Sequence, residues 1–140
     1  MIEDAELRRL MMLKRLKKYE KMKDETPVPL FKKKSGARTT LIGWGSTYGA
    51  INEAINILEQ EGGKLNMLHF SGLWPFPAEK VKSALDNDDK KIVIENNATG
   101  QLAHLIRAET GIKIDNTILK FDGRPFSPEF IVTELKKEGI

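Results

Sequence analysis

From residue 38 onward, short apolar runs alternate with segments of helical periodicity, and this alternation constrains the fold more than any other feature. The predicted strands are runs of β-branched and large apolar residues at 39–44, 64–70, 91–95 and 116–121. The predicted helices, with apolar residues three and four positions apart, are at 47–61, 78–87, 101–111 and 127–139. Strands that alternate with helices of this length predict an α/β fold, in which a mostly parallel sheet is covered on both faces.

Two further elements are predicted before this alternation begins. Residues 3–24 contain neither Gly nor Pro and are rich in helix-forming residues, so they predict one long helix. Residues 28–33 predict a short strand, which Pro29 confines to the edge of a sheet because it cannot donate a backbone hydrogen bond. We therefore divide the chain into an N-terminal basic helix, residues 1–26, and an α/β domain, residues 27–140.

The net charge of +3 is unevenly distributed. Residues 1–38 hold 12 Lys and Arg and 6 Asp and Glu, so this segment is basic. Residues 39–140 hold 11 Lys and Arg and 14 Asp and Glu, so the rest of the chain is acidic. A basic arm indicates either an anionic partner or a solvated helix, and the interleaved acids favour the solvated helix. Nucleic acid is disfavoured, because the body is acidic and Tyr19 is the one aromatic residue of the predicted helix 3–24.

The N-terminal helix is also expected to be an association surface. Met12, Leu16 and Tyr19 lie on one of its faces, and such a face requires a partner, either the α/β domain or another chain. Self-association through this helix is one form of that expectation.

Composition excludes several classes of site. The chain has no Cys, so it can form no disulfide, supply no thiolate nucleophile and hold no iron–sulfur cluster. Its two histidines, His69 and His104, are 35 positions apart, and we predict neither a metal site nor a catalytic residue. No apolar run approaches the roughly 18 residues of a membrane span, and the N-terminus lacks the apolar stretch of a signal peptide, so a cytoplasmic location is expected.

Ligands of open α/β sheets bind at the carboxyl ends of the strands, so the loops that follow predicted strands are the candidate sites. The first loop offers free backbone N–H groups and two hydroxyls, which suit an anion, although a tight turn with a helix cap explains the same residues. Its candidate residues are Gly43, Gly45, Ser46 and Thr47. In the second loop, Trp74 and Phe76 each precede a proline, and they either cover the end of the sheet or anchor an interface.

The third loop is the most polar. Its candidate residues are Asn96, Asn97, Thr99, Gly100 and Gln101. Turn and capping chemistry explains Asn, Thr and Gly here about as well as binding of a polar partner does. Because a turn needs one cap and one glycine, which Thr99 and Gly100 supply, we expect the three amides to serve binding and not folding. Glu95 and Asp122 form a conceivable acid–base pair, but nothing in the sequence determines their separation.

Four motifs, in this order, resemble the C-terminal region of the α subunit of 2-oxoacid:ferredoxin oxidoreductases, most closely the 2-oxoglutarate type. They are 41–49 (LIGWGSTYG), 73–77 (LWPFP), 95–102 (ENNATGQL) and 120–126 (KFDGRPF). The resemblance implies a fold like the C-terminal domain of transketolase: a three-layer α/β/α sandwich with a mostly parallel five-stranded sheet and one antiparallel edge strand. The predicted strand at 28–33 would be that edge strand.

The resemblance also implies a function. The family oxidatively decarboxylates a 2-oxoacid on thiamine diphosphate and Mg, transfers the acyl group to coenzyme A, and passes electrons through iron–sulfur clusters to ferredoxin. The cofactor-binding parts belong to the N-terminal α domain, the β subunit and other parts of the enzyme, so no catalytic residue carries over to this chain.

We therefore expect a structural and assembly domain that is inactive alone, binds no cofactor alone, and is either a fragment or a separately encoded module. Its sheet-end loops would position neighbouring domains or coenzyme A. The alternative is a free-standing anion- or nucleotide-binding α/β module that uses the loop at 43–47.

Overall fold

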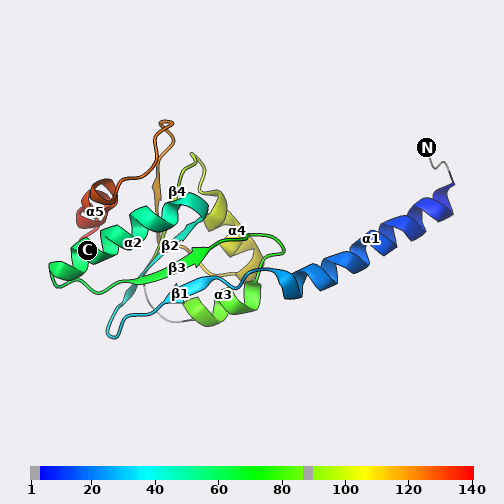
Figure 1. Cartoon of the computed structure of the whole chain (residues 1–140), viewed down its shortest axis with the longest axis horizontal. Coiled ribbons are helices and arrows are strands. Elements are labelled where there is room, and N and C mark those ends of the chain that lie inside the picture. The colour runs from blue at the N-terminus through cyan, green and yellow to red at the C-terminus, as the bar shows by residue number, and fades with distance from the viewer. Residues whose placement is uncertain (1–3, 87–89) are drawn as a thin grey trace.

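A computed structural model describes residues 4–86 and 90–140 of the chain. The body is a five-stranded sheet of order β1-β3-β2-β4-β5 between two layers of helices (Figure 1). The strands are β1 (Leu30–Lys32), β2 (Thr39–Trp44), β3 (Asn66–Phe70), β4 (Lys90–Glu95) and β5 (Asn116–Leu119). The helices are α1 (Ala5–Glu25), the 3₁₀ turn η1 (Gly45–Thr47), α2 (Tyr48–Gln60), α3 (Ala78–Leu85), α4 (Gln101–Thr110) and α5 (Pro128–Lys137).

The sheet has the predicted topology. β2 pairs in parallel with β3 and β4, and β4 pairs in parallel with β5. β1 pairs antiparallel with β3, with Leu30 opposite His69, and it occupies the edge to which Pro29 was predicted to confine it. β3 and β5 are shorter than predicted, and residue 87, the last of the predicted helix 78–87, lies outside the described residues.

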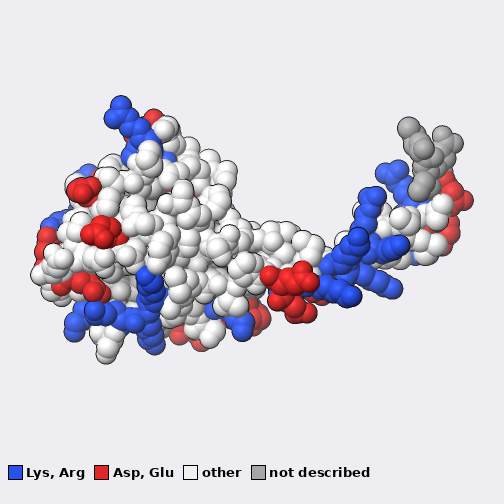
Figure 2. Space-filling model, viewed as in Figure 1, with Lys and Arg blue, Asp and Glu red and all other residues white. Residues whose placement is uncertain are grey.

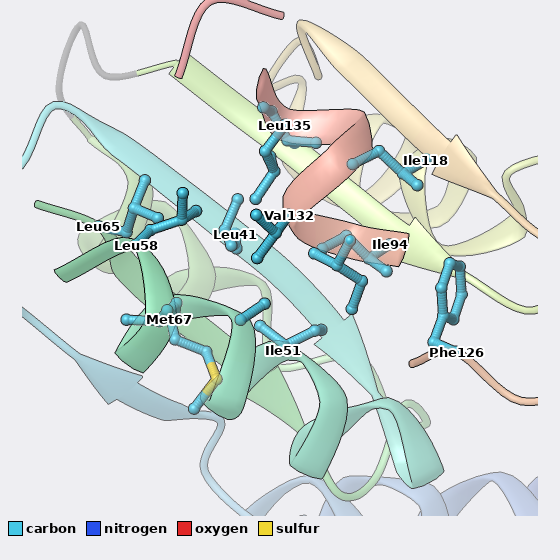
Figure 3. Close-up of a cluster of buried hydrophobic side chains, with 14 residues drawn as sticks. Leu41, Ile51, Leu58, Leu65, Met67, Ile94, Ile118, Phe126, Val132 and Leu135 are labelled. Carbon is cyan, nitrogen blue, oxygen red and sulfur yellow. The ribbon is translucent and has the colours of Figure 1, made fainter. Parts of the chain in front are cut away.

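Each face of the sheet has its own apolar core. On one face, Leu41 and Ile94 pack with residues of α2 and α5 around Ile51, Ile131 and Leu135 (Figure 3). On the other face, their chain neighbours Ile42 and Val93 pack with residues of α3 and α4. Successive side chains of a strand point to opposite faces, so the continuous apolar runs of β2 and β4 supply both cores at once. The three-layer α/β/α sandwich is confirmed.

Local sequence signals define the helix ends. Asp4 Oδ1 accepts the Leu7 N–H at 2.6 Å at the start of α1, and Ser127 Oγ accepts the Phe130 N–H at 3.3 Å at the start of α5. Pro128 occupies the first turn of α5, as predicted. At the end of α4, Gly111 adopts the left-handed conformation with φ of 77°, which a glycine accommodates without strain.

α1 projects away from the body (Figure 1), and none of its described residues is buried. Near the body, the ring of Tyr19 lies 6.0 Å from the ring of Trp74, in the loop after β3. The α/β domain therefore leaves most of the apolar surface of α1 uncovered.

Candidate functional site

The carboxyl ends of the parallel strands lie at one end of the sheet, and the loops that leave β2, β4 and β5 enclose an open hollow there. Its volume is ≈ 450 Å³. The lining residues are Ser46, Asn96, Lys120, Phe121, Gly123, Arg124 and Pro125. This hollow is the candidate site.

Glu95, the last residue of β4, supports one wall of the hollow. Its side chain is fully buried. Its carboxylate accepts the backbone N–H groups of Leu102 at 2.8 Å and Ala103 at 3.2 Å, so it satisfies donors of the first turn of α4. Asp122 has different partners: it is exposed and pairs with Lys120, which holds the pKa of its carboxyl below the usual range. Glu95 and Asp122 therefore engage separate partners.

Asn97 organises the loop between β4 and α4. Its Oδ1 accepts the backbone N–H groups of Thr99 at 3.1 Å, Gly100 at 2.7 Å and Gln101 at 3.3 Å, and its Nδ2 donates to Glu95 Oε2 at 2.7 Å. The expectation that Thr99 caps this turn is therefore wrong, and these contacts argue against the expectation that Asn97 is not needed for folding. Gly100, with φ of 66°, supplies the left-handed residue that the turn requires.

The neighbouring amides contribute less to the turn. Asn96 donates from Nδ2 to the Lys120 carbonyl at 3.4 Å, which joins this loop to the loop after β5, and it lines the hollow. Gln101 is exposed at the first position of α4. The binding role expected for these two side chains stays a prediction.

Replacing Asn97 with Ala is expected to lower the free energy of unfolding by about 1–2 kcal/mol, the usual cost of losing a capping side chain. In the variant, water can hydrogen-bond to the exposed N–H groups of the turn in place of Asn97 Oδ1, which limits the loss of stability. Asn96→Ala is the matched control and should change stability by less than about 0.5 kcal/mol. Urea unfolding of both variants measures the difference, and equal stabilities would show that Asn97 is not the organising residue.

The loop after β2 is largely structural. Thr47 is buried, and its Oγ1 accepts the Trp44 N–H at 3.0 Å and donates to the Trp44 carbonyl at 2.9 Å. Gly43 is also buried, and Gly45 has φ of 58°. Among the four candidate residues of this loop, Ser46 is the one that lines the hollow. These contacts agree with the tight turn that the sequence favours, and the anion site offered as the alternative stays a prediction.

His69 is the hydrogen-bonded core residue that its place in a strand indicates. Its Nε2 lies 3.1 Å from the Gly45 carbonyl, to which it donates, and its ring lies 5.1 Å from that of Tyr48. Burial lowers the pKa of His69, and the contact with Gly45 opposes the shift. This neutral ring therefore holds the loop after β2 in place.

The two aromatic residues of the loop after β3 lie in different surroundings. The Phe76 ring stacks on that of Phe70 at 5.7 Å and covers this end of the sheet. Trp74 is 57% exposed, and neither residue lines the hollow. Trp74 is therefore the exposed candidate of this loop for an interface, and that role stays a prediction.

The loop after β5 contributes residues that were not among the sequence-based candidates, although its motif at 120–126 was noted. Lys120 is engaged, because its Nζ pairs with Asp122 and donates to the Arg124 carbonyl at 3.3 Å. Phe121 is 71% exposed. Arg124 is exposed, and no residue among 4–86 and 90–140 pairs with its guanidinium. Figure 2 shows basic side chains at the top of the molecule, over this loop.

The described residues contain no group of three or more His, Asp or Glu side chains that could hold a metal ion. Within the same residues, no helix combines the length and the apolar character needed to cross a membrane.

Residues 37–131 match the family model described as pyruvate:ferredoxin oxidoreductase core domain II. The chain is 37% identical over 126 residues to subunit alpha of 2-oxoacid:ferredoxin oxidoreductase 2 from Aeropyrum pernix, a match that covers 88% of this chain and 20% of that one. The chain thus spans about a fifth of the length of the curated relatives it matches.

Two solved structures are similar. One is a 2-oxoglutarate:ferredoxin oxidoreductase from Magnetococcus marinus with 2-oxoglutarate, coenzyme A and succinyl-CoA bound. It is 36% identical, with a TM-score of 0.82 over 98% of this chain and 24% of that one. The other is a transketolase variant from Pichia stipitis, 15% identical, with a TM-score of 0.60 over 78% of this chain and 17% of that one. The second likeness shows the fold alone and confirms the transketolase-like architecture.

Proposed function

This chain belongs to the pyruvate:ferredoxin oxidoreductase core domain II family, and from that membership we propose that it is a structural and assembly domain of a thiamine-diphosphate-dependent 2-oxoacid:ferredoxin oxidoreductase. Its relatives are named as α subunits of such enzymes. The proposed 2-oxoacid is 2-oxoglutarate, and the proposed location is the cytoplasm. The proposed partners are the N-terminal α domain and the β subunit, with ferredoxin contacted indirectly.

The hollow at the strand ends supports the part of the proposal that concerns coenzyme A. Arg124 offers a guanidinium without a partner among the described residues, and such a group binds phosphate oxygens in a bidentate manner. Phe121 offers an exposed ring on which a base can stack, and Ser46 and Asn96 offer hydrogen-bonding groups. These residues fit the nucleotide part of coenzyme A.

The described residues do not fit the other cofactors of the family. Thiamine diphosphate is bound through Mg, and the described residues supply no cluster of ligands for a metal ion. Iron–sulfur clusters require thiolates, and the chain has no Cys. We propose that these groups bind to other parts of the enzyme, and that coenzyme A would supply the acyl acceptor when bound beside this domain.

The test uses the isolated chain and the complete enzyme. The pure chain should show no 2-oxoglutarate- and coenzyme-A-dependent reduction of a viologen dye. In the complete enzyme, Arg124→Ala should raise the KM for coenzyme A about tenfold, since a lost charge-assisted phosphate contact costs about 1.4 kcal/mol or more. The kcat should be unchanged, and Arg107→Ala, an exposed arginine on α4, is the matched control.

Three results would contradict the proposal. Turnover by the pure chain would show that it is catalytic. An unchanged KM would show that the hollow does not bind coenzyme A. Tight binding of phosphate or nucleotides by the isolated chain, with no effect on any oxidoreductase, would favour the free-standing anion-binding module.

A further inference from the structure

The apolar side chains of α1 are distributed around the whole helix. Seven are exposed: Leu7, Leu10, Met11, Met12, Leu13, Leu16 and Met22. Leu10 and Met12, 49% and 48% exposed, lie on nearly opposite sides, because two residues advance an α-helix by about 200°. A helix that lay on one flat surface would leave one of these two side chains in water.

The middle of α1 has an unusual composition. Residues 8–18 comprise six Lys or Arg and five Leu or Met, and no acid. Figure 2 shows this pattern as a basic middle section with acidic residues near the two ends of the helix. A surface that covers this segment must therefore accept apolar side chains and also carry negative charge.

We infer that residues 8–18 of α1 are enclosed on at least two sides by an acidic and apolar protein surface of the oxidoreductase, in a part that this chain does not contain. The inference rests on the proposed function. The superposition on the Magnetococcus enzyme covers 98% of this chain. The remaining 2% is much shorter than the 21 residues of α1. The Magnetococcus enzyme therefore has a polypeptide segment in the place that corresponds to most of α1. Three quarters of the Magnetococcus chain lies outside the superposition and is available to cover it.

Other occupants fit the helix less well. A helix that binds a membrane surface gathers its apolar residues on one face and its basic residues on the other, and α1 does not separate them. A second α1 aligned with the first would bring two blocks of six positive charges together. An acidic protein surface avoids both conflicts.

The absence of Cys makes cysteine labelling a clean test. Leu10→Cys and Met12→Cys are prepared separately in the full chain, alone and co-purified with the thiamine-binding and cluster-binding polypeptides of the enzyme. Maleimide labelling is followed by mass spectrometry of peptides from this chain. Both cysteines should react at least tenfold more slowly in the complex, and Ser83→Cys, at an exposed position of α3, controls for general loss of reagent access.

Charge reversal tests the acidic character of the surface. Lys14→Glu with Lys17→Glu should raise the dissociation constant of the complex tenfold or more. Lys33→Glu with Lys113→Glu, at exposed positions outside α1, makes the same change in net charge and should have little effect. Circular dichroism of each variant checks that the helix content is kept.

The outcomes separate this inference from the proposed function. An active complex in which either cysteine keeps its free reactivity, or in which charge reversal has no effect, overturns the inference and leaves the proposed function standing. Protection that appears in the isolated chain together with a dimer mass assigns α1 to a second copy and overturns the inference. Failure of the unsubstituted chain to join any oxidoreductase overturns both.

Discussion

Glu95→Ala should lower the free energy of unfolding of this chain by about 3–5 kcal/mol, because two buried N–H groups of α4 each lose a charged acceptor. The side chain is fully buried, so water cannot replace the carboxylate without opening the loop. Loss of the contact with Asn97 also loosens the turn that precedes α4. Equilibrium unfolding in urea, monitored by circular dichroism, measures the change.

Glu95→Gln is the matched control. It keeps the size of the side chain and one carbonyl acceptor, but it turns an NH₂ group toward backbone donors. It should therefore cost about 1–3 kcal/mol, less than the Ala variant. If Glu95→Ala and Glu95→Gln both unfold like the unsubstituted chain, the carboxylate does not hold the start of α4.

Gly43→Ala is expected to cost about 3 kcal/mol, at the upper end of the range for overpacking a core. A Cβ atom at this position would lie 2.3 Å from Ile51 Cδ1 and 2.6 Å from Thr47 Oγ1. Ile51 is fully buried, and Thr47 Oγ1 is bonded to both backbone groups of Trp44, so neither can move freely. Thermal and urea unfolding should both show the loss.

Gly49→Ala, six residues further along, is the control for this substitution. A Cβ atom there would meet nothing within 4 Å, and Gly49 lies in α2, where Ala is the better helix former. This variant should gain up to about 1 kcal/mol. A Gly43→Ala chain as stable as the Gly49→Ala chain would mean that the close approach of β2 and α2 relaxes without cost.

The order of strands and helices was predictable because burial imposes a period on the sequence. β2 and β4 are apolar on both faces, so they are continuous runs, whereas α2 and α5 bury one face and repeat every three or four residues. Pro29 identified β1 as an edge strand because proline has no N–H group to donate to a neighbouring strand. The ends of β3 and β5 were less predictable, because pairing with a neighbouring strand determines where a strand stops.

The site was predicted less completely, since its hydrogen bonds join loops that are distant in the chain. Ser46 and Asn96 were candidates, and the structure brings them together. Arg124 and Phe121 were overlooked, because only the strand order β2-β4-β5 places the last loop beside the other two. Asn97 was misjudged for a related reason: its polarity is visible in the sequence, but the three donors that converge on its Oδ1 are not.

The three residues of β1 also limit how the sheet can grow. An exposed sheet edge is a template on which another chain can add a strand. Here the edge strand consists of the three residues Leu30–Lys32, and Pro29, immediately before this strand, has no N–H group to donate. The side chain of Lys32 is drawn back over the body, where its Nζ donates to Tyr48 at 2.8 Å and Asn52 at 2.7 Å. This side of the domain is therefore protected against edge-to-edge aggregation.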